Sequence, residues 1–201
     1  MLLQVHPTHP EPRKIKRVVE TLENGGVIVY PTDTVYGLGC DIRQKKALTQ
    51  LYRMKGISDD HPVSFVCPDL ADIARYAVVD DFAYRIMKRL LPGPFTFILN
   101  ATREVPRMVM RKRKKVGIRV PDHPVALAIV KELGAPILST SASRPDEPFM
   151  NDPEDIAEVF KAADIVIDSG RGGIQPSTIL DLSEGRVELI REGAGDPGPI
   201  V

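Results

Sequence analysis

Three apolar segments of the chain each lead directly into a group of small polar side chains. These groups lie in YPTDT (residues 30–34), LSTSAS (138–143) and DSGRGGIQPST (168–178). Short hydroxyl groups and nearby backbone N–H groups suit carboxylates and phosphates, because they donate hydrogen bonds without blocking close approach. Each group alone could equally be a turn, in which Ser, Thr, Asp and Gly serve the backbone. Together they favour one crevice at the ends of neighbouring strands, where α/β proteins bind ligands.

The first polar group continues into two glycines that frame a leucine. Thr32, Asp33 and Thr34 come directly after the apolar run, and Gly37 and Gly39 follow shortly afterwards. We expect a polar loop here that uses the conformational freedom of both glycines.

Five consecutive basic residues form a dense charge cluster: Arg111, Lys112, Arg113, Lys114 and Lys115. Such charges repel one another unless solvent or a polyanion relieves the repulsion. One interpretation is a solvated loop. The other is a surface for nucleic acid or a triphosphate, where binding would weaken steeply with salt.

Two basic residues stand apart from this cluster. Arg119 interrupts the apolar sequence VGIRV, so its side chain should emerge on one face of a strand, towards a ligand or an ion partner. Lys55 ends a predicted helix, where the helix dipole stabilises a cation and a phosphate contact is an equal alternative.

The composition describes one globular domain. The chain has 201 residues, 43% hydrophobic and 27% charged, so it can bury a core and shows no signature of disorder. Lys plus Arg and Asp plus Glu balance at 27 each, so net charge identifies no partner. Two separate cysteines, Cys40 and Cys67, and the lack of a signal sequence or apolar span predict a cytoplasmic protein that contacts no membrane.

Signatures of familiar catalytic machinery are missing from the sequence. The four histidines, at positions 6, 9, 61 and 123, have no metal-ligand spacing, and each lies beside a proline. We therefore expect turn residues and no metal site built from protein side chains. The sequence contains no G-x-S-x-G elbow and no G-x-x-x-x-G-K-[ST] loop, so any bound ATP is not held in the P-loop manner.

Helical and strand-like patterns alternate along the chain. Apolar residues at helical spacing, together with start and stop signals, predict helices over 11–26, 43–56, 69–76, 80–93, 125–134 and 152–163. Short apolar or alternating runs predict strands over 27–30, 62–67, 94–101, 116–120, 135–140, 163–170, 177–183 and 186–193. This alternation predicts a single α/β or α+β domain spanning 1–201, with tails at 1–12 and 193–201.

The chain resembles the YrdC/YciO family. The resemblance is carried by VIVYPTDTVYGLGCD, LPGPFTFIL, VGIRVPDHPVA, PILSTSAS, STILDL and IREG, which occur in the family's order between about Lys14 and Gly193. Within the family the chain is most similar to the YciO subgroup. The resemblance implies a twisted open α/β sheet of the YrdC type, in one domain with a concave basic surface.

The best-known members of this family are L-threonylcarbamoyladenylate synthases. Their reaction joins L-threonine, bicarbonate and ATP to give threonylcarbamoyl-AMP and pyrophosphate, and a partner enzyme then transfers the threonylcarbamoyl group to tRNA. The resemblance therefore implies ATP, L-threonine and bicarbonate as substrates, with Mg²⁺ accompanying ATP. Two anions must meet in this step, so cations together with hydroxyl or amide donors are the groups that it needs.

The family pattern assigns roles to particular residues of this chain. Thr34, Arg119, Ser139 and Ser177 match positions that contact L-threonine, with the Arg119 guanidinium holding its carboxylate. The ATP-contacting positions are Lys55, Lys115, Ser141 and Arg191, and of these Lys55 and Ser141 are the expected catalytic residues.

Four positions depart from the family pattern. The K-x-R motif reads Lys55-Gly56-Ile57, and the S-x-N motif reads Ser141-Ala142-Ser143. His61 replaces the usual asparagine, and Val66 replaces a substrate-side histidine. The residues for threonine are thus mostly retained, whereas the set for ATP activation is reduced.

Two main hypotheses follow from this mixture, and a different acyl- or carbamoyl-adenylate chemistry on the same fold is a third that the sequence does not separate from them. The first is a synthase that forms threonylcarbamoyl-AMP. The second is a paralogue that binds tRNA, other double-stranded RNA or a nucleotide in the same basic cavity without forming the adenylate. In the second case the cluster of residues 111–115 would contact RNA, and Ile57 and Ser143 favour this alternative.

Overall fold

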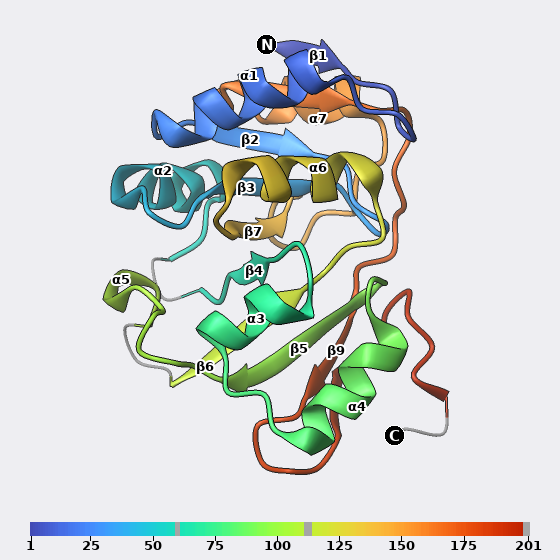
Figure 1. Ribbon diagram of the computed structural model, residues 1–201. Helices are drawn as coiled ribbons and strands as arrows, with labels where there is room; N and C mark the ends of the chain where they lie inside the picture. Colours follow the sequence, from blue (N-terminus) through green and yellow to red (C-terminus); the bar gives the residue numbers. More distant parts are fainter. Residues whose placement is uncertain (59–60, 111–113, 199–201) are drawn as a thin grey trace.

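The fold is one twisted ten-stranded sheet with helices on both faces (Figure 1). The computed structural model describes residues 1–58, 61–110 and 114–198. The strands are β1 (Leu2–Gln4), β2 (Val27–Tyr30), β3 (Gly37–Asp41), β4 (Ser64–Val66), β5 (Phe95–Asn100), β6 (Lys115–Arg119), β7 (Ile137–Ser141), β8 (Ile165–Asp168), β9 (Thr178–Asp181) and β10 (Glu188–Arg191). Their order across the sheet is β1-β8-β2-β3-β7-β4-β6-β5-β9-β10. The predicted α/β class is therefore confirmed.

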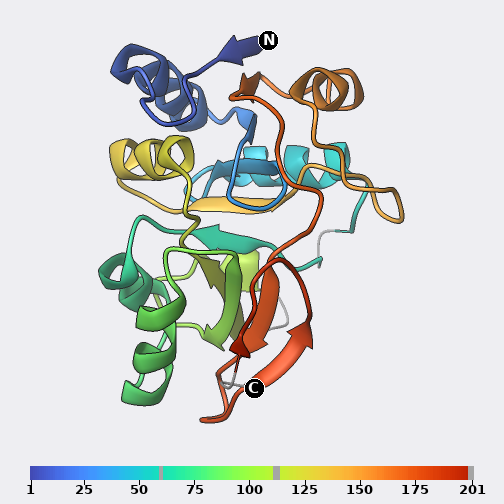
Figure 2. The same cartoon turned by 90° about the vertical axis from the view of Figure 1, so that its right-hand side faces the viewer.

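The helices are α1 (Pro12–Glu23), α2 (Lys45–Lys55), α3 (Leu70–Tyr76), α4 (Asp81–Leu90), α5 (Arg107–Met110), α6 (Pro124–Leu133) and α7 (Pro153–Val159). Figure 2 shows α1, α6, α3 and α4 in a row along one face of the sheet, with α2 and α7 on the other. The predicted helices are all present, although α7 ends earlier than its sequence pattern suggested and α5 was not predicted. None of the helices in the described part of the chain has the length and apolar character needed to cross a bilayer.

Local sequence signals set the ends of the helices. The Asp80 side chain accepts a hydrogen bond from the Ala83 N–H at 2.8 Å and so caps α4. His123 caps α6 in the same way, because its ring nitrogen accepts from the Val125 N–H at 3.3 Å. Gly56 follows the last residue of α2 in the left-handed region, at φ 73°, where a glycine is favoured.

In the half of the sheet that contains β5, one face packs against the hydrophobic core and the other face lines a cavity. Phe95, Phe97 and Leu99 alternate along β5 and are buried in the core. Thr96, Ile98 and Asn100 point to the opposite side and line a cavity. The strand period of two thus separates core from cavity, and neighbouring strands repeat this separation.

The segment after the first polar group forms a strand, and the predicted loop is wrong. Gly37 to Asp41 is β3, which pairs with both β2 and β7. A Cβ on Gly37 would meet the Tyr30 ring at 2.8 Å, and one on Gly39 would meet Ile137 Cγ2 at 2.5 Å. The glycines are therefore required by close packing across the sheet, because they make room for Tyr30 and Ile137.

This packing predicts the effect of adding one methyl group. Gly39→Ala should destabilise the fold by about 1–3 kcal/mol, because Ile137 and the backbone around it must shift. Gly117→Ala in β6 is the matched control, since its Cβ would first meet the Ser64 hydroxyl, at 3.2 Å. Urea unfolding should show a clear loss for Gly39→Ala and a smaller one for Gly117→Ala; equal losses would contradict the packing account.

Both predicted tails are partly ordered, and the expectation for these segments is wrong. Leu2–Gln4 forms β1 at one edge of the sheet and runs parallel to β8. At the other end, the N–H groups of Gly193 and Gly195 donate to the Thr178 hydroxyl, at 3.0 and 3.1 Å. Short terminal segments with few apolar residues gave too weak a pattern for these pairings to be predicted.

Candidate functional site

The polar groups that end the predicted strands converge on one cavity of about 1180 Å³. Its wall includes Arg119 of β6, Ser139 and Ser141 of β7, Arg191 of β10, and Ser177, which directly precedes β9. Segments far apart in the sequence are therefore brought together as the sequence predicted.

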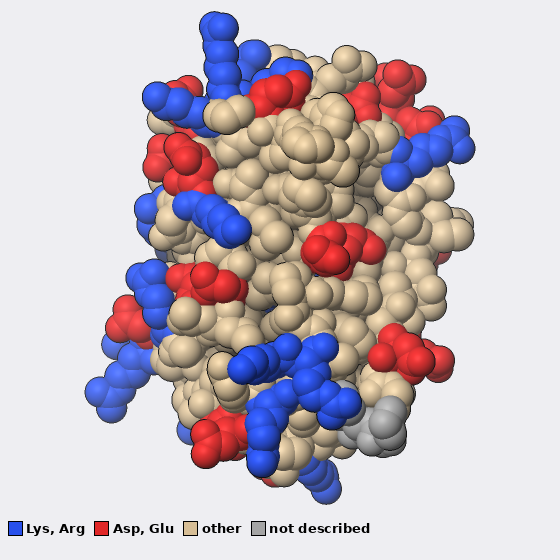
Figure 3. All heavy atoms as spheres, turned by 45° about the vertical axis from the view of Figure 1, so that its right-hand side comes forward, with Lys and Arg blue, Asp and Glu red and all other residues tan. Residues whose placement is uncertain are grey.

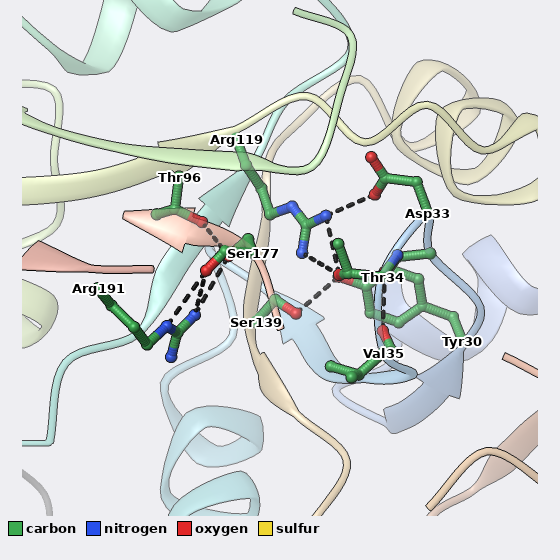
Figure 4. Close-up of polar contacts among 10 residues, drawn as sticks. Tyr30, Asp33, Thr34, Val35, Thr96, Arg119, Ser139, Ser177 and Arg191 are labelled. Carbon is green, nitrogen blue, oxygen red and sulfur yellow. Dashed lines mark hydrogen bonds and ion pairs between the residues drawn. The ribbon is translucent and has the colours of Figure 1, made fainter. Parts of the chain in front are cut away.

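Arg119 is the buried cation at one end of this cavity, and Figure 4 shows how it is held. Both of its terminal nitrogens donate to the Thr34 hydroxyl at 3.2 Å. Nη2 also forms an ion pair with Asp33 Oδ1 at 2.5 Å, between side chains that are only 10% and 9% exposed. Arg119 Nε and Asp33 Oδ2 are buried without a hydrogen-bond partner. The sequence left open whether Arg119 has a ligand or an ion partner; it has an ion partner and also lines the cavity.

Thr34 lies behind Arg119, away from the cavity surface. It is 2% exposed, and its hydroxyl lies 3.1 Å from that of Thr32. Thr34 is therefore placed to orient the guanidinium of Arg119. A direct contact between Thr34 and a substrate remains a prediction.

A second arginine lies beside Ser177. Arg191 Nη2 donates to the Ser177 carbonyl at 2.8 Å, and the Ser177 hydroxyl lies 2.8 Å from that of Thr96. Burial, and then the positive charge of Arg119, lower the pKa of Arg191. Two guanidinium groups that repel each other across a cavity form a site that an anion would stabilise.

Ser139 is held by a buried tyrosine. The Tyr30 hydroxyl donates to Ser139 Oγ at 2.6 Å, and Tyr30 is completely buried. Burial raises the pKa of Tyr30 to about 12, so the phenol stays protonated and remains a donor. The Ser139 hydroxyl, which already accepts this bond, can donate its own proton into the cavity.

Lys55 crosses from the end of α2 to the end of β7. Its Nζ donates to the Ser141 carbonyl at 2.7 Å, to the Ser141 hydroxyl at 2.8 Å and to the Ser143 carbonyl. It is 5% exposed, and burial lowers its pKa to about 8. A dipole contact at a helix end does not account for this burial, so Lys55 belongs to the cavity.

The basic cluster gives a weaker signal than its sequence suggested. Arg111, Lys112 and Arg113 lie outside the described residues. Lys115 lines the cavity but is paired with Asp181 at 3.1 Å and Glu184 at 3.4 Å. Its charge is therefore largely balanced by these two carboxylates.

Charges of both signs surround the cavity. The basic residues on its wall are Lys55, Lys114, Lys115, Arg119, Arg144 and Arg191, and the acidic ones are Asp146, Glu147, Asp181 and Glu184. Figure 3 shows one face of the molecule, on which Lys and Arg side chains gather in the lower half with Asp and Glu side chains around them. A concave basic surface that binds RNA remains a prediction.

The four positions that the resemblance predicts to depart from the family pattern lie in or beside the site. Ile57, His61 and Ser143 line the cavity. Val66 is fully buried and pairs in register with Arg119. The replacements therefore change the cavity wall and the surroundings of its buried arginine.

Some contacts in the site were not indicated by the sequence, although Tyr30 and Asp33 lie in the first polar group. Asp33 and Thr96 hold Arg119 and Ser177, and Tyr30 holds Ser139. Thr96 had a usable signal, because it is the polar residue of the alternating run PFTFIL. Asp33 and Tyr30 had none, since their partners lie 86 and 109 residues away in the chain.

Groups that could hold a metal are not apparent. Among residues 1–58, 61–110 and 114–198, no cluster of three or more His, Cys, Asp or Glu side chains is arranged to bind an ion. Cys40 and Cys67 are buried, and burial raises the pKa of Cys40 to about 12, so that its thiol is protonated and unreactive at neutral pH.

Comparison with known proteins identifies the class. Residues 20–193 match the Sua5, YciO and YrdC family, whose description reads "Telomere recombination". This chain belongs to the Sua5/YciO/YrdC family, so the resemblance seen in the sequence is confirmed.

Its relatives fall into two groups. YciO of Escherichia coli strain K12, described as an uncharacterized protein, is 42% identical over 98% of this chain and 97% of its own length. The crystal structure of E. coli YciO has a TM-score of 0.95 at 41% identity and covers 100% of this chain and 99% of that chain. A putative threonylcarbamoyl-AMP synthase of Methanocaldococcus jannaschii is 34% identical over 96% of this chain and 92% of its own length.

A ligand-bound structure is also similar. The crystal structure of P. abyssi Sua5 complexed with L-threonine has a TM-score of 0.89 at 28% identity. It matches 96% of this chain, which in turn covers 57% of that longer protein.

Proposed function

We propose that this protein binds L-threonine in the cavity and joins it, with bicarbonate and ATP, to form threonylcarbamoyl-AMP and pyrophosphate. The observation that carries the proposal is that two arginines, the buried Arg119 and the more exposed Arg191, line one cavity together with serine side chains. Relatives named as synthases and the L-threonine complex of P. abyssi Sua5 support the same reaction.

In this proposal Arg119 binds the threonine carboxylate. A guanidinium offers paired donors that match a carboxylate, and Thr34 and Asp33 hold it in place. Ser139 and Ser177, each already bonded on one side, supply hydroxyl donors to the polar atoms of the amino acid.

The nucleotide lies at the other end of the cavity, near Lys55 and Ser141. The three N–H groups of charged Lys55 are already directed at Ser141 and Ser143. Lys55 therefore acts by its charge and by holding the Ser141 hydroxyl, because a direct bond to phosphate would require breaking one of these contacts. Arg191 supplies a further positive charge.

Mg²⁺ would enter with the phosphates of ATP. The carboxylates on the cavity wall nearest the basic cluster, Asp181 and Glu184, are paired with Lys115. We therefore assign no protein ligand to Mg²⁺ and no step to such a ligand. When bound, the ion would share the negative charge of the phosphates.

The test is release of pyrophosphate from ATP by the full chain at saturating L-threonine and bicarbonate. We expect release that depends on both co-substrates and exceeds a control without protein. Release that is independent of threonine, or no release, would refute the proposal. Among the described residues, RNA binding has no observation of its own in its favour, since Lys115 is paired within the protein.

The charge of Lys55 predicts a pH dependence of nucleotide binding. Its pKa is lowered to about 8, so Lys55 is charged below this pH and loses its charge above it. Affinity for ATP should therefore be highest below pH 8 and should fall by up to about tenfold per pH unit above it. Titration calorimetry between pH 7 and 9.5 measures this change. A Lys55→Gln variant should bind more weakly with no such step, and an identical step in that variant would assign it to another group.

A further inference from the structure

The contacts around Lys55 also fit a different chemical role. A neutral lysine amine has two N–H donors and one lone pair, and here the carbonyl and hydroxyl oxygens of both Ser141 and Ser143 surround Nζ, with the Ser141 hydroxyl nearer than that of Ser143, at 2.8 Å against 3.3 Å. The carbonyls of Ser141 and Ser143 can accept both N–H groups. The lone pair is then left facing the Ser141 hydroxyl at 2.8 Å, where it can accept the hydroxyl proton.

The hydroxyl is accessible from the cavity. Ser141 is the last residue of β7, is half-buried and lines the cavity, as does Lys55. Ser143 Oγ lies 3.1 Å from Ser141 Oγ and is itself 3% exposed. A small molecule in the cavity can therefore reach Ser141 Oγ from the side that faces away from Lys55.

The surroundings of Lys55 favour its neutral form. Nζ contacts no carboxylate in the described part of the chain, and burial lowers its pKa to about 8. Four titratable side chains of the cavity wall lie in the segments that come after α2 and after β7 in the chain. They are His61, Arg144, Asp146 and Glu147. With this pKa, Lys55 is neutral in about half of the molecules near pH 8, and a lysine with a pKa in this range can serve as a base.

We propose that Ser141 and Lys55 form a nucleophile–base pair, so that Ser141 accepts an acyl group from an activated donor such as an acyl phosphate or an aryl ester. Pairs of serine and lysine serve this purpose in other folds. The assignment goes beyond the proposed synthase reaction, in which Ser141 lies at the nucleotide and forms no covalent bond.

The step is balanced within the site. Ser141 Oγ forms a bond to the carbonyl carbon of the donor while its proton passes to Lys55 Nζ. The bond from that carbon to the leaving oxygen breaks, and Lys55 returns the proton to this oxygen. Water then attacks the acyl carbon and gives a proton to Lys55. The bond from this carbon to Ser141 Oγ breaks, and Lys55 returns the proton to Oγ, which releases the carboxylic acid and the free Ser141 hydroxyl. Arg119 and Arg191 line the same cavity and place the developing negative charge in a positive field.

The two roles use opposite protonation states of Lys55. Charged Lys55 favours nucleotide binding below pH 8, whereas only neutral Lys55 can accept the Ser141 proton. The two activities should therefore have opposite pH dependences around the same midpoint.

The test uses diisopropyl fluorophosphate, which reacts with activated serines, and intact-mass measurement of the full chain. Attack by Ser141 Oγ forms an O–P bond, fluoride leaves and the proton passes to Lys55. We expect one adduct, mapped to Ser141, with a rate that rises through pH 8 and then levels off. No adduct, an adduct on another serine, or equal rates at pH 6.5 and 9.5 would overturn the proposal.

Two variants separate base catalysis from structural support. Lys55→Arg keeps a positive donor towards Ser141 and Ser143 but cannot act as a base, and Lys55→Gln removes the charge. In each variant that retains the thermal unfolding midpoint of the parent, labelling should slow at least about 100-fold. Labelling at the parental rate in such a variant would overturn the pair. Pyrophosphate release without labelling would refute this inference alone, whereas labelling without pyrophosphate release would refute only the synthase proposal.

Discussion

Replacement of Arg119 by methionine should abolish measurable threonine binding and also destabilise the fold. The guanidinium supplies the charged donors for the carboxylate, so affinity should fall roughly 100-fold or more. The change also leaves the Asp33 carboxylate, 9% exposed, without its partner. Removing one member of a buried ion pair costs about 3–5 kcal/mol. Titration calorimetry with L-threonine and urea unfolding measure the two effects.

A second substitution separates these two effects. The double variant Arg119→Met/Asp33→Asn has no unpaired carboxylate at position 33. Most of the lost free energy of unfolding should therefore return, whereas threonine binding should stay lost. If the double variant binds threonine as the parent does, Arg119 does not contact the substrate. If it remains as unstable as the single variant, the cost comes from packing around Arg119.

Introducing the residues that the resemblance assigns to the family at two positions should increase turnover of the proposed synthase reaction. Ile57 lies on the cavity wall, and Ser143 lies beside Lys55 with its hydroxyl 3.3 Å from Nζ. Ile57→Arg/Ser143→Asn adds a guanidinium and an amide where charge develops on the phosphates. Because one such donor is worth about 10²–10³ in kcat, we expect a gain of at least roughly tenfold in threonine-dependent pyrophosphate release.

A matched variant controls for changes of volume. Ile57→Met/Ser143→Ala alters the same two side chains without adding donors and should show no gain. An equal gain in both variants would point to altered packing. No gain in the arginine and asparagine variant, despite intact ATP binding, would show that these two positions do not limit turnover.

Most of the strands and helices, other than β1, β3 and α5, could be predicted from the sequence because their signals are local. The apolar run at 27–30 and the helical spacing of Ile15, Val18 and Leu22 depend only on near neighbours, and both elements form as predicted. The shared cavity could also be predicted, since the polar groups follow strands that end close together. Residue roles carried over from the family are still predictions, and their placement around one cavity is consistent with them.

Features that depend on pairing between distant segments could not be predicted. Gly37 and Gly39 have the composition of a loop, and only the position of the Tyr30 ring makes them strand residues. The contact of Asp33 with Arg119 requires β6 to lie against the loop after β2, which no local pattern encodes. No local sequence pattern around Lys55 indicates its partner, because Ser141 lies 86 residues further along the chain.

The most direct test is a crystal structure of the full chain grown with L-threonine. We predict the amino acid in the cavity, with its carboxylate within hydrogen-bonding distance of Arg119 and its remaining polar atoms between Ser139 and Ser177. An L-threonine molecule bound on another surface, or saturating L-threonine that leaves Arg119 without a ligand, would contradict the account.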